Sequence, residues 1–314
     1  MTLLAELLDG DRRALARAIS AVEDGTEQAS VILAGIHHRV GRAAVVGFTG
    51  PPGAGKSTLI GGYVSALRQS GRTVAVIAVD PSSPLTGGAI LGDRVRMLAH
   101  AEDDGVFIRS LAARGHLGGL SATAPLVIDL MDAAGFDVVI IETVGAGQSE
   151  VEIAELAAVT VVVCAPGLGD DVQAIKAGIL EIADVLVVNK GDSPEAAVTR
   201  AQLFASQHLR SGEHRAVPIL TATATTGQGI AELVAAIDAK LGEQPPRKTD
   251  SAQRIRRMLA AQAARLVRDS VLAGTDPTIE AICQDLQNGR LAIAQALARL
   301  FAACAQPKPP EKTD

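Results

Sequence analysis

The fold of this chain is decided by residues 50–57, which read G-P-P-G-A-G-K-S. A short apolar run rich in β-branched residues (43–48) precedes them and predicts a buried strand, and a helical pattern opens with Lys56, Ser57 and Thr58. A strand, a glycine-rich loop and a helix in this order form a phosphate-binding loop. Glycines permit the tight turn, and backbone N–H groups at the start of the helix then face phosphate oxygens. We therefore expect this loop to bind the phosphates of a nucleotide.

Two side chains of this loop have predicted chemical roles. Lys56 is expected to reach the β- and γ-phosphates and to act in catalysis, and the Ser57 hydroxyl is expected to ligate Mg²⁺. The residues predicted to contact phosphate are Gly50, Gly53, Ala54, Gly55, Lys56, Ser57 and Thr58.

A second pattern, N-K-G-D at residues 189–192, identifies the base. It follows the apolar run 183–188, and ligands of open α/β sheets bind where such strands end. The Asp192 carboxylate can accept hydrogen bonds from guanine N1–H and its amino group, a pair of donors that adenine lacks. Asn189 would contact the base edge or brace the loop, and the Lys190 stem would cover a ring face. A later segment, Thr221, Ala222 and Thr223, is expected to close over the base, so GTP or GDP is the predicted ligand.

Three acids between these patterns are candidates for a magnesium site. Asp80 ends one strand-like run, Asp93 lies in the glycine- and proline-bearing segment that follows, and Glu142 ends another run. Carboxylates at the ends of strands beside a phosphate loop suit Mg²⁺ or its water shell, although each could instead be a solvated residue or a helix cap. Gly145 would bring its N–H to the γ-phosphate, and Gln148 would position water. The predicted metal set is Ser57, Asp80, Asp93 and Glu142, and the predicted catalytic set is Lys56, Asp93, Glu142 and Gln148.

Alternating strand and helix patterns predict an α/β fold of the P-loop NTPase class, a mostly parallel sheet flanked by helices. We expect an N-terminal helical extension (1–41), the GTPase domain (42–242), a C-terminal helical arm (243–305) and a disordered tail (306–314). Asp11 has the character of a helix N-cap within the first region.

Composition excludes several classes of function. The 314 residues are 48% hydrophobic and 2% aromatic, and no apolar run is long enough to span a membrane. Three cysteines far apart in sequence (Cys164, Cys283 and Cys304) indicate neither a disulfide framework nor a zinc site, which fits a cytoplasmic location. A net charge of −6 without a basic block argues against nucleic acid as the principal partner. The histidines are interpreted as surface or capping residues.

Several long motifs closely resemble the MeaB/ArgK family of P-loop GTPases. They are G-P-P-G-A-G-K-S-T (50–58), V-D-P-S-S-P-L-T-G-G-A-I-L-G-D-R-V-R-M (79–97), F-I-R-S-L-A-A-R-G (107–115), I-E-T-V-G-A-G-Q-S-E (141–150) and N-K-G-D (189–192). The likeness runs from about Leu4 to Leu241. It implies Mg²⁺ contacts at Ser57, Asp80, Asp93 and Glu142, in agreement with the set above.

The resemblance also implies a partner. Such proteins use GTP hydrolysis to gate delivery of adenosylcobalamin to an acyl-CoA mutase and removal of damaged cofactor. It implies a homodimer formed through the C-terminal helices and a mutase-sensing loop containing Asp170, Gln173 and Lys176. From the residues alone, that loop is a strand-to-helix turn with a capping aspartate.

The positions at which the chain departs from the family pattern bear on the partner and the assembly more than on the nucleotide site. Ala146 replaces the usual valine, no tryptophan occurs, and the C-terminal part matches less well. Two alternatives therefore stay open: a transporter-associated or small-molecule phosphotransferase, and a metal-insertion GTPase, which usually offers Cys/His clusters that this chain lacks.

Overall fold

The computed structural model describes residues 2–80, 100, 102–112, 123–143, 149–166, 181–209, 217–243 and 271–304, with isolated positions between 256 and 270. The chain forms two compact units, Met1–Thr249 and Asp250–Asp314. Within the described ranges, no helix has both the length and the apolar character needed to cross a membrane.

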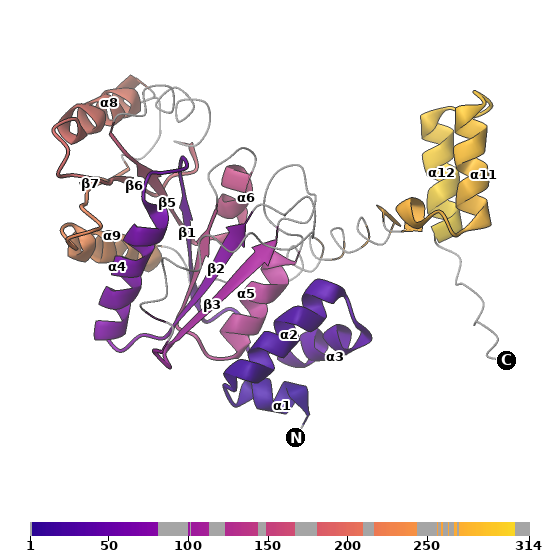
Figure 1. Ribbon diagram of the computed structural model, residues 1–314, viewed down its shortest axis with the longest axis horizontal. Coiled ribbons are helices and arrows are strands. Elements are labelled where there is room, and N and C mark those ends of the chain that lie inside the picture. Colours follow the sequence, from indigo (N-terminus) through magenta and orange to yellow (C-terminus); the bar gives the residue numbers. More distant parts are fainter. Residues whose placement is uncertain are drawn as a thin grey trace. The chain divides into compact units, whose positions relative to one another are not determined.

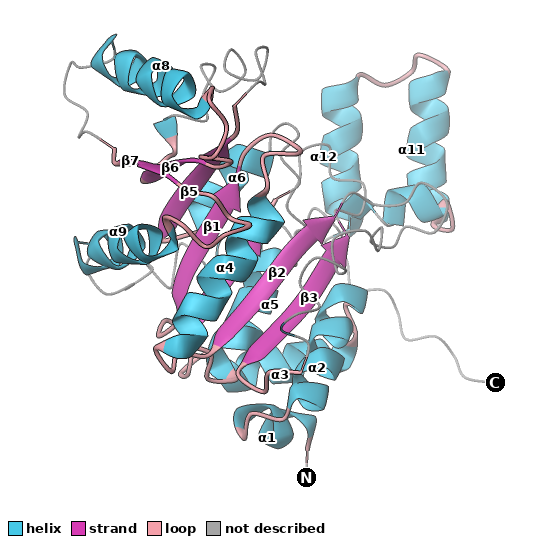
Figure 2. Ribbon diagram, turned by 60° about the vertical axis from the view of Figure 1, so that its left-hand side comes forward, coloured by secondary structure: helices cyan, strands magenta, loops and turns pink. Residues whose placement is uncertain are grey.

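The first unit is built on a seven-stranded sheet in the order β3-β2-β4-β1-β5-β6-β7, with every pair parallel (Figures 1 and 2). The strands are β1 (Ala44–Thr49), β2 (Val74–Asp80), β3 (Val106–Ala112), β4 (Val138–Glu142), β5 (Val159–Cys164), β6 (Val185–Val188) and β7 (Ile219–Thr221). Apolar runs of β-branched residues suit this sheet because helices cover both of its faces. The predicted α/β fold with a parallel sheet is confirmed.

Different helices cover the two faces of the sheet. α4 (Lys56–Gln69) and α9 (Ile230–Glu243) share one core with β1, β5 and β6. α8 (Ala196–Leu209) packs on the opposite side of β5 and β6, where Leu203 meets Val162 and Leu186. α6 (Ser149–Leu156) lies against β1, and α5 (Ala124–Ala133) packs beside β4. Because every strand pair is parallel, all seven strands end at one edge of the sheet, where the phosphate loop follows β1 and the N-K-G-D motif follows β6.

Three helices form the N-terminal region: α2 (Arg12–Asp24) and α3 (Glu27–Ile36) pack on α5, and α1 (Leu3–Leu8) packs on α2 and α3 (Figure 1). The predicted start signal is confirmed, because Asp11 Oδ1 accepts a hydrogen bond from Ala14 N at 2.7 Å. Asp132 of α5 accepts hydrogen bonds from three successive backbone N–H groups (41–43) and so fixes the entry into β1.

The strand β3 is absent from the strands predicted by sequence pattern. It forms one edge of the sheet and carries Arg109 and Ser110, so its apolar run is interrupted. Arg109 donates to Glu23 Oε2 at 2.5 Å and to Ser20 Oγ at 3.1 Å, which ties β3 to α2.

The second unit contains α11 (Pro277–Gln287) and α12 (Ile293–Cys304), which pack against each other. α11 ends before Asn288 and Gly289, and Gly289 has φ +69°. Ile279 and Ile282 are buried, whereas Ile293, Leu297 and Phe301 recur every four residues on α12 and are 72%, 48% and 61% exposed.

Candidate functional site

The central strand β1 delivers the phosphate-binding loop, since β4 and β5 flank it and the loop follows Thr49. Gly50 has φ +137°, and a Cβ there would lie 2.0 Å from the Val163 carbonyl oxygen. Gly53 and Gly55 have φ of +77° and +86°, in the left-handed region that L side chains rarely adopt. The path of this loop therefore depends on glycine at three positions.

Lys56 and Ser57 begin α4 directly behind this loop. Lys56 is 7% exposed, and its ammonium donates to the carbonyl oxygens of Gly50 at 2.8 Å and Pro51 at 3.0 Å. The loop thus wraps around its own lysine. Phosphate oxygens entering this loop could take over the hydrogen bonds that the two carbonyls now receive.

Ser57 and Glu142 meet at the head of α4. The Ser57 hydroxyl donates to Glu142 Oε1 at 2.7 Å, and each residue is 5% exposed. Glu142 reaches this position because β4 pairs with β1 in the register Phe48 to Glu142. Hydroxyl and carboxylate oxygens are the ligands that Mg²⁺ prefers, and Mg²⁺ sites often use one or two carboxylates with substrate phosphates. These two residues fit a magnesium ion.

The other predicted metal ligands are less fully described. Asp80 is the last residue of β2, which pairs with β4 at Ala78 and Glu142, so its backbone lies at the same edge of the sheet. Asp93 lies outside the described residues, and so do Gly145 and Gln148. The residues of the predicted mutase-sensing loop, Asp170, Gln173 and Lys176, also lie outside them. Among the residues that are described, no three His, Cys, Asp or Glu side chains form a metal-binding group.

A buried pair of threonines was missed by sequence reasoning. Thr143 Oγ1 donates to Thr49 Oγ1 at 2.9 Å, and Thr143 N donates to the Phe48 carbonyl at 3.1 Å. Both side chains are at most 1% exposed. The pair joins the end of β1 to Thr143, the first residue after β4. The available signal was a threonine just after an apolar run in both places.

Asn189 braces the phosphate loop. Its Nδ2 donates to the Ala54 carbonyl at 2.9 Å and to the Gly55 carbonyl at 3.4 Å, and its Oδ1 accepts from Ala224 N at 3.1 Å. A Cβ at Gly55 would lie 2.4 Å from Asn189 Nδ2, so this contact requires glycine. Of the two predicted roles for Asn189, the described contacts are those of a brace that joins the predicted phosphate and base loops.

The remaining residues predicted to recognise the base lie at the same edge of the sheet. Lys190 and Asp192 are exposed, and Lys190 has φ +54°. Gly191 N donates to the Ala222 carbonyl at 2.9 Å, which joins this turn to the loop after β7. Thr221 is exposed, whereas Ala222 and Thr223 are buried. Asp192 is therefore accessible to an incoming base, and the turn that carries it is hydrogen-bonded to the loop after β7.

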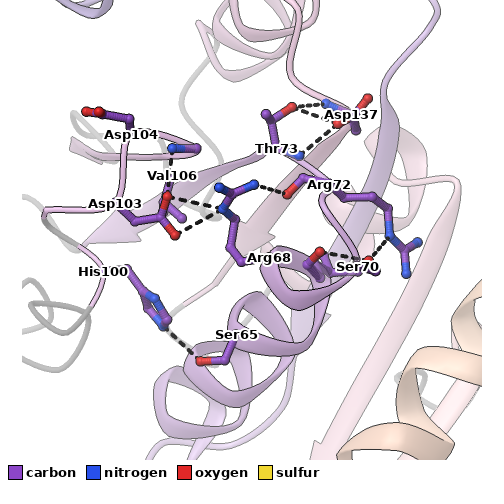
Figure 3. A network of polar contacts seen from close by, with 12 residues as sticks. Ser65, Arg68, Ser70, Arg72, Thr73, His100, Asp103, Asp104, Val106 and Asp137 are labelled. Atoms are coloured by element: carbon purple, nitrogen blue, oxygen red, sulfur yellow. Dashed lines mark hydrogen bonds and ion pairs between the residues drawn. The ribbon is translucent and has the colours of Figure 1, made fainter.

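A polar network ties the other end of α4 to the turn before β3 (Figure 3). Arg68 Nε donates to Asp103 at 3.0 and 3.2 Å, and its Nη1 donates to the Arg72 carbonyl at 2.7 Å. His100 Nε2 lies 3.1 Å from the Gly61 carbonyl and 3.5 Å from Ser65 Oγ. The pKa of Asp103 is lowered below its ordinary value, mainly by the hydrogen bonds that Arg68 donates and next by the hydrogen bond from Gly105 N.

Comparison with known proteins agrees with this geometry. The family model described as methylmalonyl Co-A mutase-associated GTPase MeaB matches residues 15–277. A Pyrococcus horikoshii protein that carries the name GTPase is 45% identical over 282 residues, covering 86% of this chain and 88% of the relative. The mitochondrial methylmalonic aciduria type A homolog of Mus musculus is 36% identical over 250 residues, covering 74% and 60%. The solved structure of a LAO/AO transport system kinase superposes with a TM-score of 0.66 at 29% identity over 97% of each chain.

Proposed function

Because this chain belongs to the MeaB family of P-loop GTPases and is a GTP hydrolase, we propose that its hydrolysis gates adenosylcobalamin loading of an acyl-CoA mutase and protects or repairs that enzyme. The client assignment is supported by the description of the matching family, which names methylmalonyl-CoA mutase. The name of the mouse relative points in the same direction. A cytoplasmic location, expected from the cysteine pattern, belongs to the same proposal.

One observation carries the catalytic part of the proposal: the 2.7 Å contact between Ser57 and Glu142 beside the buried Lys56. Ser57 and Glu142 would hold Mg²⁺, with Asp80 and Asp93 as further proposed ligands. When bound, Mg²⁺ neutralises charge on the β- and γ-phosphates. Lys56 binds the same phosphates, and the loop glycines let backbone N–H groups approach them. Gly145 and Gln148 are proposed to contact the γ-phosphate and the attacking water.

The base half of the site follows from the same geometry. Asp192 would accept hydrogen bonds from guanine, the stem of Lys190 would cover the ring, and residues 221–223 would border the base. Asn189 would keep this half in a fixed position relative to the phosphate half.

The experiment that tests the client is GTP hydrolysis by the purified protein, alone and with each cobalamin-dependent acyl-CoA mutase added. The candidate mutases act on methylmalonyl-CoA, isobutyryl-CoA or 2-hydroxyisobutyryl-CoA. Strong stimulation by one of them, about tenfold or more, is expected because a partner can complete a GTPase site. No stimulation by any of them would contradict the chaperone proposal.

The segment containing Asp170, Gln173 and Lys176 is proposed to sense the mutase. Lys176→Ala should therefore reduce partner-stimulated hydrolysis more than GTP affinity. Equal loss of both would show that Lys176 serves nucleotide binding instead.

The second candidate function is phosphotransfer, which the name of the structural relative, a transport system kinase, favours. It predicts that the γ-phosphate passes to a protein or small-molecule acceptor rather than to water. Radiolabelled GTP with candidate acceptors distinguishes the two functions. The third alternative, a metal-insertion GTPase, has no supporting cluster of metal ligands among the described residues.

A further inference from the structure

The helices that follow the two nucleotide loops pack directly on each other. α4 begins where the phosphate loop ends, and α9 begins at Ile230, where the loop after β7 ends. Both helices lie on one face of the sheet, where Leu233 and Ile237 of α9 share a core with Tyr63 and Val64 of α4 (Figures 1 and 2). The two loops are therefore joined through their helices as well as through Asn189.

The two helices come into close contact at Gly62. A Cβ added to Gly62 would lie 3.0 Å from Ile230 Cδ1 and 3.3 Å from Ile230 Cγ1, closer than ordinary van der Waals contact. Ile230 is 6% exposed and is the first residue of α9. α9 can come this near to α4 because Gly62 has no side chain.

Ile230 is in turn connected to the loop beside the base motif. Its N–H donates to the Gly227 carbonyl at 3.3 Å, and Thr223 N donates to the Gln228 carbonyl at 2.9 Å across the loop. Gly229 has φ +83°, and a Cβ there would lie 2.4 Å from the Thr221 carbonyl oxygen. A loop held this tightly moves with the start of α9.

These contacts form a closed ring. It runs from the phosphate loop through α4 to Gly62 and Ile230, then through the loop 221–229 to Asn189, which returns to the Ala54 carbonyl at 2.9 Å. We propose that Gly62 and Ile230 are positioning residues for nucleotide retention, whose contact holds the base half of the site at a fixed distance from the phosphate half. The proposal rests on the proposed guanine site at Asp192.

The chain offers a matched test, because two adjacent glycines of α4 differ in what an added Cβ would meet. No described atom lies within 4 Å of a Cβ added at Gly61. Alanine or leucine raises helix propensity at either position, but only at position 62 does the new side chain press on Ile230. The test compares Gly62→Ala and Gly62→Leu with Gly61→Ala and Gly61→Leu in the full-length protein.

The readouts are the dissociation rate of fluorescent GDP and the competition constant of pyrophosphate, which uses the phosphate loop alone. Gly62→Leu should speed GDP release about tenfold, and Gly62→Ala about threefold, because changes at a binding site alter mainly the off-rate. The Gly61 variants should release GDP at the wild-type rate. Pyrophosphate affinity should stay within about twofold of wild type in all four variants. Adding Ile230→Val, which removes the nearest methyl group, should slow GDP release from Gly62→Ala again.

Three results would overturn the proposal: equal effects at positions 61 and 62, no change at position 62, or a parallel loss of pyrophosphate affinity. Asp192→Asn is measured alongside to separate the proposal from its premise. If Asp192→Asn weakens GDP but the Gly62 variants do not, the positioning role is wrong. If Asp192→Asn leaves GDP binding unchanged, the assignment of the base motif is wrong instead.

Discussion

Tyr63 places a hydroxyl inside an apolar core. Its side chain is fully buried on α4 against Phe48, and among the described residues its hydroxyl has no hydrogen-bond partner. Burial raises the pKa of Tyr63 well above its ordinary value, and the Asp238 carboxylate adds to the rise. Because the chain has one tyrosine and no tryptophan, tyrosinate absorbance reports this residue alone.

We predict that Tyr63 of the native protein does not ionise near pH 10, where the denatured chain titrates. The folded state keeps a proton that the unfolded state loses, so the stability of the protein falls as the pH rises above about 10. Tyr63→Phe should remove this part of the pH dependence. At pH 7 it should change the free energy of unfolding by less than about 1 kcal/mol, because no described hydrogen bond is lost. A larger loss in urea denaturation would show that the hydroxyl has a partner.

Glu142 is the described side chain whose charge the proposed mechanism needs most. Glu142→Gln keeps an acceptor for the Ser57 hydroxyl but removes the negative charge, so Mg²⁺-dependent hydrolysis should fall by about 100-fold. GDP affinity without Mg²⁺ should be unchanged. Ser57→Ala should cause a similar loss, and the double variant should be little worse, since both residues act on one ion. Hydrolysis close to wild type in Glu142→Gln would refute the metal assignment.

For single residues, the sequence predicted which residues belong to the site better than it predicted what they contact. Lys56, Ser57 and Asn189 follow from local patterns, because backbone and spacing alone decide a phosphate loop. The choice between base contact and brace for Asn189 could not be made, since it depends on the Ala54 and Ala224 backbone groups, far away in sequence. The Thr49–Thr143 pair was missed for the same reason.

Among the helices, α4 makes polar contacts at both of its ends, and Arg68 makes those at the C-terminal end (Figure 3). Asp103 is partly exposed, and its pKa is lowered chiefly by Arg68 and then by Gly105 N. A lowered folded-state pKa stabilises the protein above the ordinary carboxyl pKa and loses this effect as the pH falls through the folded-state value. Asp103→Asn should therefore lower the urea midpoint at pH 7, and the difference from wild type should shrink in acid.

Asp104 supplies the control for this prediction. It is fully exposed and lies 3.6 Å from Arg12, so Asp104→Asn should barely move the midpoint at any pH. Gly105→Ala should resemble Asp103→Asn, because its Cβ would lie 2.1 Å from Arg68 Cζ. A pH-independent effect of Asp103→Asn would mean that the contribution of Asp103 is not electrostatic.

Strands were predictable from the sequence where both of their faces are buried. β1, β4 and β6 are apolar on both faces and were predicted from the apolar runs that precede the phosphate loop, Glu142 and the N-K-G-D motif. β3 was not, because an edge strand presents polar side chains, here Arg109 and Ser110, that interrupt the apolar run. Its partner Glu23 lies 86 residues earlier, and no local pattern signals such a contact.

For the whole molecule, the second unit is the part that the family match covers least. The family match ends at residue 277, the first residue of α11, so the α11–α12 hairpin lies outside it. Few of its side chains are buried, and the exposed stripe of Ile293, Leu297 and Phe301 continues along α12. The sequence predicted a helical arm in this region, but an apolar helix face does not specify what covers it.

We propose that this stripe pairs with the same stripe of a second copy, since an isolated hairpin with so few buried residues is poorly stabilised by itself. Leu297→Glu with Phe301→Glu places two charges on the stripe and should convert a dimer into a monomer in sedimentation velocity at micromolar concentration. Gln295→Glu, an exposed position on the opposite side of the same helix, serves as the control and should leave the dimer intact. Intrinsic GTP hydrolysis should be preserved in both, because every described residue proposed for the nucleotide site lies in the first unit. A monomeric wild type, or a dimer that survives both glutamates, would contradict this assembly.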